Sequence, residues 1–262
     1  MEISAAVGGD QGSERVFVSA STSCFSDKPF DEALRQIMDL EYDKVEIWMN
    51  EETDHLKPST VVADPEQFFA RYREVTRLSP VAFCFASEVT PRQFEVICKL
   101  AKQMRITQIT VPASPLGTPF NAEIDRLKEL LVISSQDGIR LSIPTRNGDL
   151  TEDPRTAVEL CQATPGLGLT LDPSYYLCGP HRNAGFDQVY PYTYHTHLRD
   201  TSETQVQVKV GLGEVDYSRL ISQLNRNRYS RALSVDLFPE MIEADQRPIE
   251  MRKLRLLLES LL

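Results

Sequence analysis

The stretch IRLSIPTRNGDLTEDP (139–154) contains a strand, a turn and the start of a helix, the unit from which the rest of the chain is built. Its apolar, β-branched run at 139–145 is typical of a parallel strand that is buried on both faces. After the turn, Asp153 followed by Pro154 is the pattern of a helix N-terminus. Pro144 interrupts the strand-like run, although proline lacks a backbone N–H and is rare inside a sheet.

The same alternation recurs along the chain. Strand-like runs lie at 15–20, 43–49, 81–86, 106–113, 139–145, 167–172, 194–200 and 231–237. Helical patterns separate them, and two begin with the cap sequences Asp64-Pro65 and Thr90-Pro91. Eight strands alternating with helices predict the α/β class and a single-domain (β/α)8 TIM barrel over 15–262. A doubly wound open sheet is the competing architecture, but no GxGxxG follows the first strand and the eightfold count favours closure.

Composition narrows the function classes. The formal net charge of −10 and pI of about 5.0 argue against a nucleic-acid surface, which needs a basic stripe. The sequence has no apolar run long enough to span a membrane. We interpret residues 1–14 as a disordered leader rather than a signal peptide. The five cysteines are widely spaced and suit reduced core thiols, so we expect a cytoplasmic protein.

In such a barrel, chemistry is expected where the strands end. Polar side chains at these ends are Glu46, Asn50, Glu51, Glu52, Arg146, Asn147, Asp172, His197, Arg199, Asp200 and Asp236. Converging carboxylates and an imidazole could hold a divalent cation or transfer protons. Purely structural roles for these residues stay open, because Asp172 could begin a turn and His197 could be a half-buried structural residue. His55 and His181 lie in polar loops and are expected at the surface.

Several motifs together resemble one family. The sequences DKVEIW, NGDLTEDP, GLGLTLDPS, HTHLRDTS, GLGEVDYSRL and ALSVDLF are similar to those of xylose isomerase-like TIM barrels. That family includes sugar phosphate isomerases and epimerases, inosose dehydratase and endonuclease IV. The resemblance implies a metal site at Asp172, His197 and Asp236. The family's fifth-strand Glu falls on Pro144, and a frequent family His falls on Tyr175.

The first hypothesis is therefore an isomerase- or epimerase-like enzyme for a small sugar, polyol or keto compound. The resemblance implies a Mn, Mg, Zn or Co ion on the three ligands, with Asp236 and His197 as catalytic residues. Candidate substrate-binding residues are Arg199, Arg146, Glu46 and Trp48. Because Arg146 follows Pro144 by two residues, we also expect its guanidinium to be able to neutralise Asp172 or Asp236 in place of a cation.

The alternative is a non-catalytic relative that binds a metabolite or a protein and has lost the metal centre, which the residues at 144 and 175 favour. An endonuclease IV-like activity is disfavoured, because its metal cluster needs many histidines and this acidic chain has four. The expected partner is a sugar-like small molecule, with no nucleic acid or membrane. The leucines of LRLLLESLL (254–262) could pack on the barrel or on a second copy in a homodimer.

Overall fold

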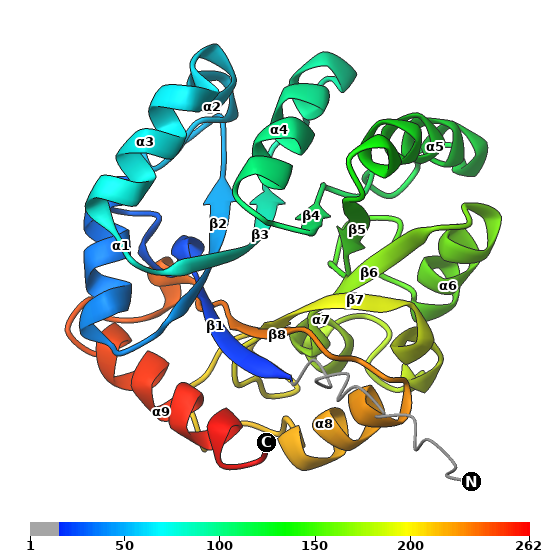
Figure 1. Cartoon of the computed structure of the whole chain (residues 1–262). Helices are drawn as coiled ribbons and strands as arrows, with labels where there is room; N and C mark the ends of the chain where they lie inside the picture. Colours follow the sequence, from blue (N-terminus) through cyan, green and yellow to red (C-terminus); the bar gives the residue numbers. More distant parts are fainter. Residues whose placement is uncertain (1–15) are drawn as a thin grey trace, which may run out of the picture.

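Eight parallel strands close into a ring in the computed structural model, which describes residues 16–262 (Figure 1). The strands are β1 (Phe17–Ser21), β2 (Lys44–Met49), β3 (Ser79–Phe85), β4 (Gln108–Thr110), β5 (Arg140–Pro144), β6 (Leu167–Leu171), β7 (Thr193–Leu198) and β8 (Ala232–Val235). Each strand pairs with its sequence neighbours, and β8 pairs with β1 from Phe17↔Ala232 to Ala20↔Val235. The predicted closed TIM barrel is confirmed. The predicted leader, 1–14, lies outside the described residues.

Helices surround the ring on its outer side (Figure 1). They are α1 (Phe30–Asp39), α2 (Pro58–Ala63), α3 (Pro65–Val75), α4 (Pro91–Gln103), α5 (Phe120–Gln136), α6 (Pro154–Ala163), α7 (Pro173–Cys178), α8 (Tyr217–Arg226) and α9 (Arg247–Glu259). The predicted caps form as expected. Thr90 makes a full capping box with Gln93, while the carboxylates of Asp64 and Asp153 accept backbone N–H bonds at the starts of α3 and α6.

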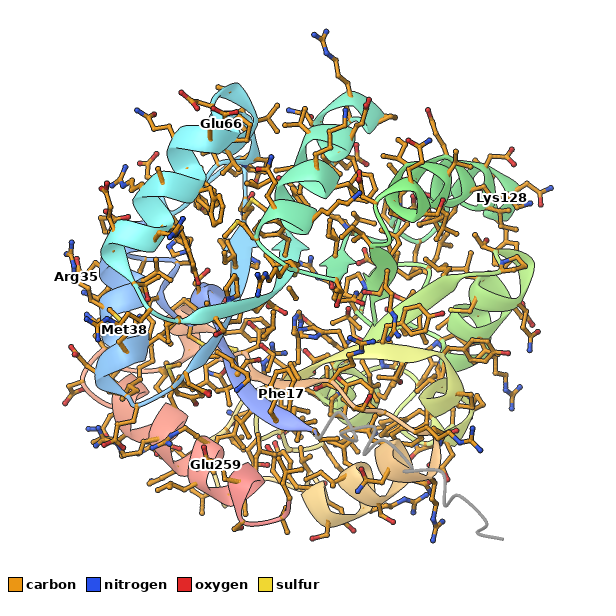
Figure 2. All side chains as sticks on the ribbon, in the orientation of Figure 1. Phe17, Arg35, Met38, Glu66, Lys128 and Glu259 are labelled. Carbon is orange, nitrogen blue, oxygen red and sulfur yellow. The ribbon has the colours of Figure 1, made fainter. Side chains whose placement is uncertain are left out.

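The apolar core lies between the strands and these helices. Side chains that alternate outward along the strands, such as Val45, Ile47 and Leu169, are fully buried against the helices. Met251, Leu254 and Leu258 of α9 join the same core, whereas Leu256 on the outer side of that helix is exposed. Figure 2 shows the outer helix surfaces covered by long polar side chains such as Arg35 and Glu66. The C-terminal helix therefore packs on the barrel, and homodimer formation stays a prediction.

The interior of the barrel is polar, unlike the layers of Val, Ile and Leu usual in this fold. Ser142 is fully buried there, where its Oγ is 2.7 Å from Thr170 Oγ1 and accepts a 2.7 Å bond from Gln108 Nε2. Thr110 Oγ1 lies 2.8 Å from Thr170 Oγ1 and extends this network across three strands. Small hydroxyl side chains leave room along the barrel axis for larger charged groups from other strands.

Pro144 is the last residue of β5. Its missing N–H therefore falls at the end of the ladder, where it disrupts the sheet least. Its carbonyl accepts a 2.7 Å bond from Thr151 Oγ1, which ties the turn back to the strand. The proline thus ends the strand at the mouth of the barrel and brings no polar side chain to the mouth.

Asp200 connects two of the motifs that the sequence analysis singled out. Its Oδ2 accepts bonds from the N–H groups of Gly211 (2.7 Å) and Gly213 (3.1 Å), and its Oδ1 accepts one from Thr201 (3.0 Å). A Cβ at Gly213 would lie 2.0 Å from Asp200 Oδ1, so only glycine fits there. The HLRD and GLGEVD motifs therefore form one loop anchor, and Asp200 has a structural role.

We expect Asp200→Ala to lower the free energy of unfolding by about 2 kcal/mol, because backbone donors lose a buried acceptor. Urea denaturation followed by circular dichroism measures this change. Glu214→Ala, an exposed substitution in the same loop, is the matched control and should change stability by less than about 0.5 kcal/mol. Equal stabilities of the two variants would contradict the anchoring role.

Candidate active site at the mouth of the barrel

Arg199 lies at the centre of the site, directly after β7. Its side chain is 1% exposed, and its Nη1 and Nη2 atoms bond Asp172 Oδ2 and Asp236 Oδ2. Its Nε donates a 2.7 Å bond to the carbonyl of Asp236, and its guanidinium carbon lies 3.8 Å from the centre of the Phe238 ring. A permanent cation thus joins two buried carboxylates from opposite sides, a geometry that the planar guanidinium suits.

The predicted metal ligands Asp172, His197 and Asp236 do converge on this part of the barrel, but they do not fit a metal ion. The carboxylate oxygens that would face the ion already bond Arg199. Pro144 offers no donor atom in place of the family's Glu. His197 turns its Nε2 away, toward Glu46 at 2.9 Å, and keeps its Nδ1 3.6 Å from Asp236 Oδ2. The positive charge of this site is therefore built into the protein.

The expectation that Arg146 would neutralise these carboxylates is wrong, because Arg199 takes that position. β5 ends at Pro144, so the alternation of side-chain direction no longer applies two residues later. Arg146 is exposed in the loop that follows. It lies near Asp149 and Tyr175. Burial raises the pKa values of both side chains, and the positive charge of Arg146 offsets part of that rise.

A second group of charged side chains extends from the mouth into the barrel. Glu46 of β2 is fully buried, and its Oε2 faces the Nε2 atoms of both His195 and His197. The two imidazole rings are 5.4 Å apart and nearly perpendicular. Burial alone would raise the pKa of Glu46, but the two imidazoles outweigh it and hold that pKa below its usual value. For His197, Glu46 and Asp236 outweigh burial and raise the pKa well above its usual value.

Two side chains at one edge of this network, His197 and Asp236, are accessible to a ligand at the mouth of the barrel. His197 and Asp236 are each 7% exposed, whereas Asp172 is 2% exposed. Ser23, in the short 3-10 helix Thr22–Phe25 that follows β1, donates a hydrogen bond to Asp236 Oδ1 and is also slightly exposed. Ser23 was not among the predicted site residues, although the hydroxyl run STS (21–23) at the end of a strand was a visible signal.

The remaining predicted residues lie around this centre. Trp48 is half-buried at the end of β2, with its ring 5.9 Å from that of His55. His55 is not a surface residue as expected, since its Nδ1 bonds the carbonyl of Lys28 at 2.8 Å and its Nε2 bonds Thr22 Oγ1 at 3.1 Å. The loop that follows β2 folds back over the end of β1 and buries the ring.

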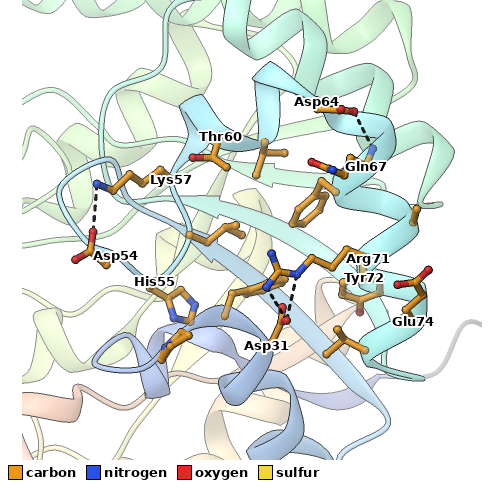
Figure 3. A pocket seen from close by; sticks show the side chains of 17 residues that line it. Asp31, Asp54, His55, Lys57, Thr60, Asp64, Gln67, Arg71, Tyr72 and Glu74 are labelled. Carbon is orange, nitrogen blue, oxygen red and sulfur yellow. Dashed lines mark hydrogen bonds and ion pairs between the residues drawn. The ribbon is translucent and has the colours of Figure 1, made fainter.

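A hollow of about 820 Å³ opens on the outside of the barrel rather than at its mouth (Figure 3). Phe30, Phe68 and Tyr72 line it, and an ion pair between Asp31 and Arg71 crosses one side. None of the residues at the centre of the candidate site lines this hollow. It is separate from the convergent charged groups, which make the barrel mouth the candidate active site.

Asp149, in the loop after β5, gives a pH-dependent prediction. Burial raises the pKa of its carboxyl to about 6, and Arg146 offsets this only in part. The folded protein then loses stability as the pH rises from about 4 to about 6, because the native state holds the proton more tightly. We expect Asp149→Asn to be more stable than the wild type by about 1 kcal/mol at pH 7.5, after allowance for solvent screening, and equal to it at pH 4. Thermal unfolding at both pH values measures this, and an equal difference at both would contradict it.

The comparisons with known proteins support the fold and its family. The family model described as xylose isomerase-like TIM barrel matches residues 34–257. No match was found among the curated proteins. Within residues 16–262, no helix combines the length and apolar character that a membrane crossing requires.

Solved structures with the same fold are similar over nearly their whole length. A xylose isomerase-like TIM barrel protein from Mycobacterium smegmatis in complex with magnesium has a TM-score of 0.70 at 17% identity, covering 94% of this chain and 97% of that one. A probable 3-DHS dehydratase from Bacillus anthracis has a TM-score of 0.68 at 15% identity, and the match covers 91% of this chain and 98% of that one. D-allulose 3-epimerase from Methylomonas sp. in complex with D-allulose has a TM-score of 0.64 at 12% identity, and the match covers 92% of this chain and 97% of that one. With the family model matching most of its length, this chain belongs to the xylose isomerase-like TIM barrel family.

Proposed function

We propose that this chain is an isomerase-type enzyme that moves a proton on a small polyhydroxylated carbonyl compound at the mouth of the barrel. One observation carries the proposal: the carboxylate of Asp236 lies at the reachable edge of the site between the permanently charged guanidinium of Arg199 and the imidazole of His197, whose Nδ1 is 3.6 Å from Asp236 Oδ2. The solved structures with the same fold include a D-allulose 3-epimerase and a probable 3-DHS dehydratase. These names support an enzyme of the isomerase, epimerase or lyase type.

The arrangement suits one acid/base group rather than two. Asp236 would take the proton from the carbon next to the carbonyl, and the positive charge at His197 would stabilise the negative charge that develops on the substrate oxygen. Epimerisation needs a second acid/base group on the other face of that carbon. Pro144 replaces the family's Glu and cannot serve there. A base that removes the proton from C2 of an aldose and returns it to C1 on the same face, while the hydroxyl proton passes from O2 to O1, gives the ketose; this aldose–ketose isomerisation is the reaction type that we propose.

The other predicted residues would position the substrate. Arg199 is too buried to reach a ligand directly, so it would act by holding Asp236 and Asp172 in place. The half-buried rings of Trp48 and Phe238 would cover the apolar face of a sugar. Arg146, exposed beside Tyr175, would meet an anionic group on the substrate. Glu46 would orient His197 from inside the barrel.

Proton exchange with solvent tests this function. The purified chain is incubated in D2O with small aldoses, ketoses and their phosphate esters, and deuterium at the carbon next to the carbonyl is followed by NMR. We expect exchange or isomerisation with at least one compound, and no change in this rate in Arg71→Ala, which lies on the outer helix α3. The absence of exchange with every compound, including any that binds by calorimetry, would contradict the proposal.

A binding protein without catalysis is the second candidate. Arg199 closes the predicted metal site, and Pro144 removes one of its ligands. These two features favour a relative that recognises a polyhydroxylated metabolite without converting it. Calorimetric binding of such a compound, without deuterium incorporation, is the result that distinguishes this candidate from the isomerase.

A further inference from the structure

We propose that Glu46, His195 and His197 form a binding site for a divalent transition-metal ion such as Zn²⁺ inside the barrel, below the site that Arg199 occupies. One ligand atom from each of these side chains lies within 4.8 Å of the others. All three side chains point into the barrel from β2 and β7 and are buried. This site uses a different set of ligands from the predicted one and goes beyond the proposed function.

Charge balance in the barrel supports a divalent ion. The connected network has three carboxylates, one permanent cation and two imidazoles: Glu46, Asp172, Asp236, Arg199, His195 and His197. Neutrality of this buried group requires two further positive charges, since a buried uncompensated charge is costly. Two imidazolium rings 5.4 Å apart would repel each other. One divalent cation between neutral imidazoles supplies the same charge without that repulsion.

Unpartnered polar atoms surround the same place. Glu46 Oε1 is buried and has no hydrogen-bond partner, although Oε2 of the same carboxylate faces both imidazoles. The hydroxyls of Ser19 and Ser234 are also buried without a partner. Ser19 is on β1 and Ser234 is on β8, the two strands that lie between β7 and β2 around the ring. Buried polar groups are normally satisfied, so these orphans are consistent with an ion and a water bound to it.

The donor set identifies the class of ion. Two imidazole nitrogens and one carboxylate oxygen suit Zn²⁺, Fe²⁺ or Co²⁺, whereas Mg²⁺ and Ca²⁺ prefer oxygen alone. With its Nε2 toward the ion, His197 keeps Nδ1 on the side of Asp236, 3.6 Å from Oδ2. A carboxylate behind a ligating imidazole is the usual way of orienting it. The ion would then supply, beside Asp236, the positive charge that the proposed function assigns to His197.

Zinc binding to the apo protein tests the site. The whole chain is treated with a chelator, dialysed against Zn²⁺, and its metal content and affinity are measured. We expect about one Zn²⁺ per chain in the wild type, and binding at least about 100-fold weaker in His195→Gln and in Glu46→Gln, because even the loss of an outer partner costs 10–100-fold. Arg71→Ala, on the outer helix α3, is the matched control and should bind Zn²⁺ like the wild type.

A second measurement guards against variants that fail to fold. Co²⁺ is added to the wild-type apo protein, and visible absorption typical of low-coordinate nitrogen and oxygen ligation should appear and be displaced by Zn²⁺. Failure of the wild type to bind either ion would overturn the proposal. Loss of Zn²⁺ in Asp172→Asn with full binding in His195→Gln would also overturn it and would place the metal at the mouth. The deuterium-exchange experiment tests the proposed isomerase separately, so either idea can fail alone.

Discussion

Replacing Arg199 by methionine lowers the free energy of unfolding by about 3–5 kcal/mol, the range found when one partner of a buried ion pair is removed. The expected loss is large because two carboxylates depend on this one guanidinium. Asp172 and Asp236 would stay buried with much of their compensating charge gone. Methionine fills a similar volume, so lost packing contributes little to the change. Urea denaturation followed by circular dichroism measures the effect.

Two further variants make this result specific. Arg71→Ala removes an exposed guanidinium that pairs with Asp31 on the outside of the barrel, and should cost less than about 1 kcal/mol. Arg199→Lys should fall in between, because a single ammonium group cannot bond both carboxylates with the geometry of a guanidinium. If Arg199→Met is no more harmful than Arg71→Ala, then Arg199 does not neutralise the site, and the argument against a metal at the mouth loses its basis.

The fold could be predicted from the sequence because local signals agreed with one another along the chain. Short apolar strands, cap sequences such as Thr90-Pro91 and the eightfold count all indicated a barrel, and each has a local physical cause. The boundaries of most strands were predicted to within two residues. The polar interior could not be inferred as readily, because residues such as Ser142 and Thr170 are satisfied only by partners on other strands.

The position of the site could be predicted from the sequence, but the hydrogen bonds and ion pairs between its side chains could not. His195 and His197 alternate along β7, and Arg199, the first residue after the strand, continues that alternation, so the sequence contained the information that Arg199 also points inward. That this guanidinium bonds Asp172 depends on the side-chain geometry between the neighbouring ends of β6 and β7, which the sequence does not contain. The same alternation failed for Arg146, because the strand had already ended. His55 was misjudged for a similar reason, since its burial depends on a loop folding over another strand.

Replacing Asp236 by asparagine should lower the rate of proton exchange on the substrate by about 100- to 10,000-fold, the usual contribution of a positioned acid/base group. Asparagine keeps the size of the side chain and an oxygen that can accept the bond from Ser23, but it cannot take up a proton. Deuterium incorporation by NMR, on the compound that the wild type exchanges, measures this rate. Arg71→Ala should retain the wild-type rate.

The contrast with Asp172 makes the assignment of Asp236 stringent. Asp172 bonds the same guanidinium, but its Oδ1 accepts a 3.0 Å bond from the N–H of Ser174 at the start of α7, and its side chain lies deeper in the protein. We therefore expect Asp172→Asn to reduce stability while the exchange rate of the folded variant stays within about tenfold of the wild type. If the Asp236 variant keeps its exchange rate and the Asp172 variant loses it, the base is Asp172. The roles proposed for the two carboxylates would then be exchanged.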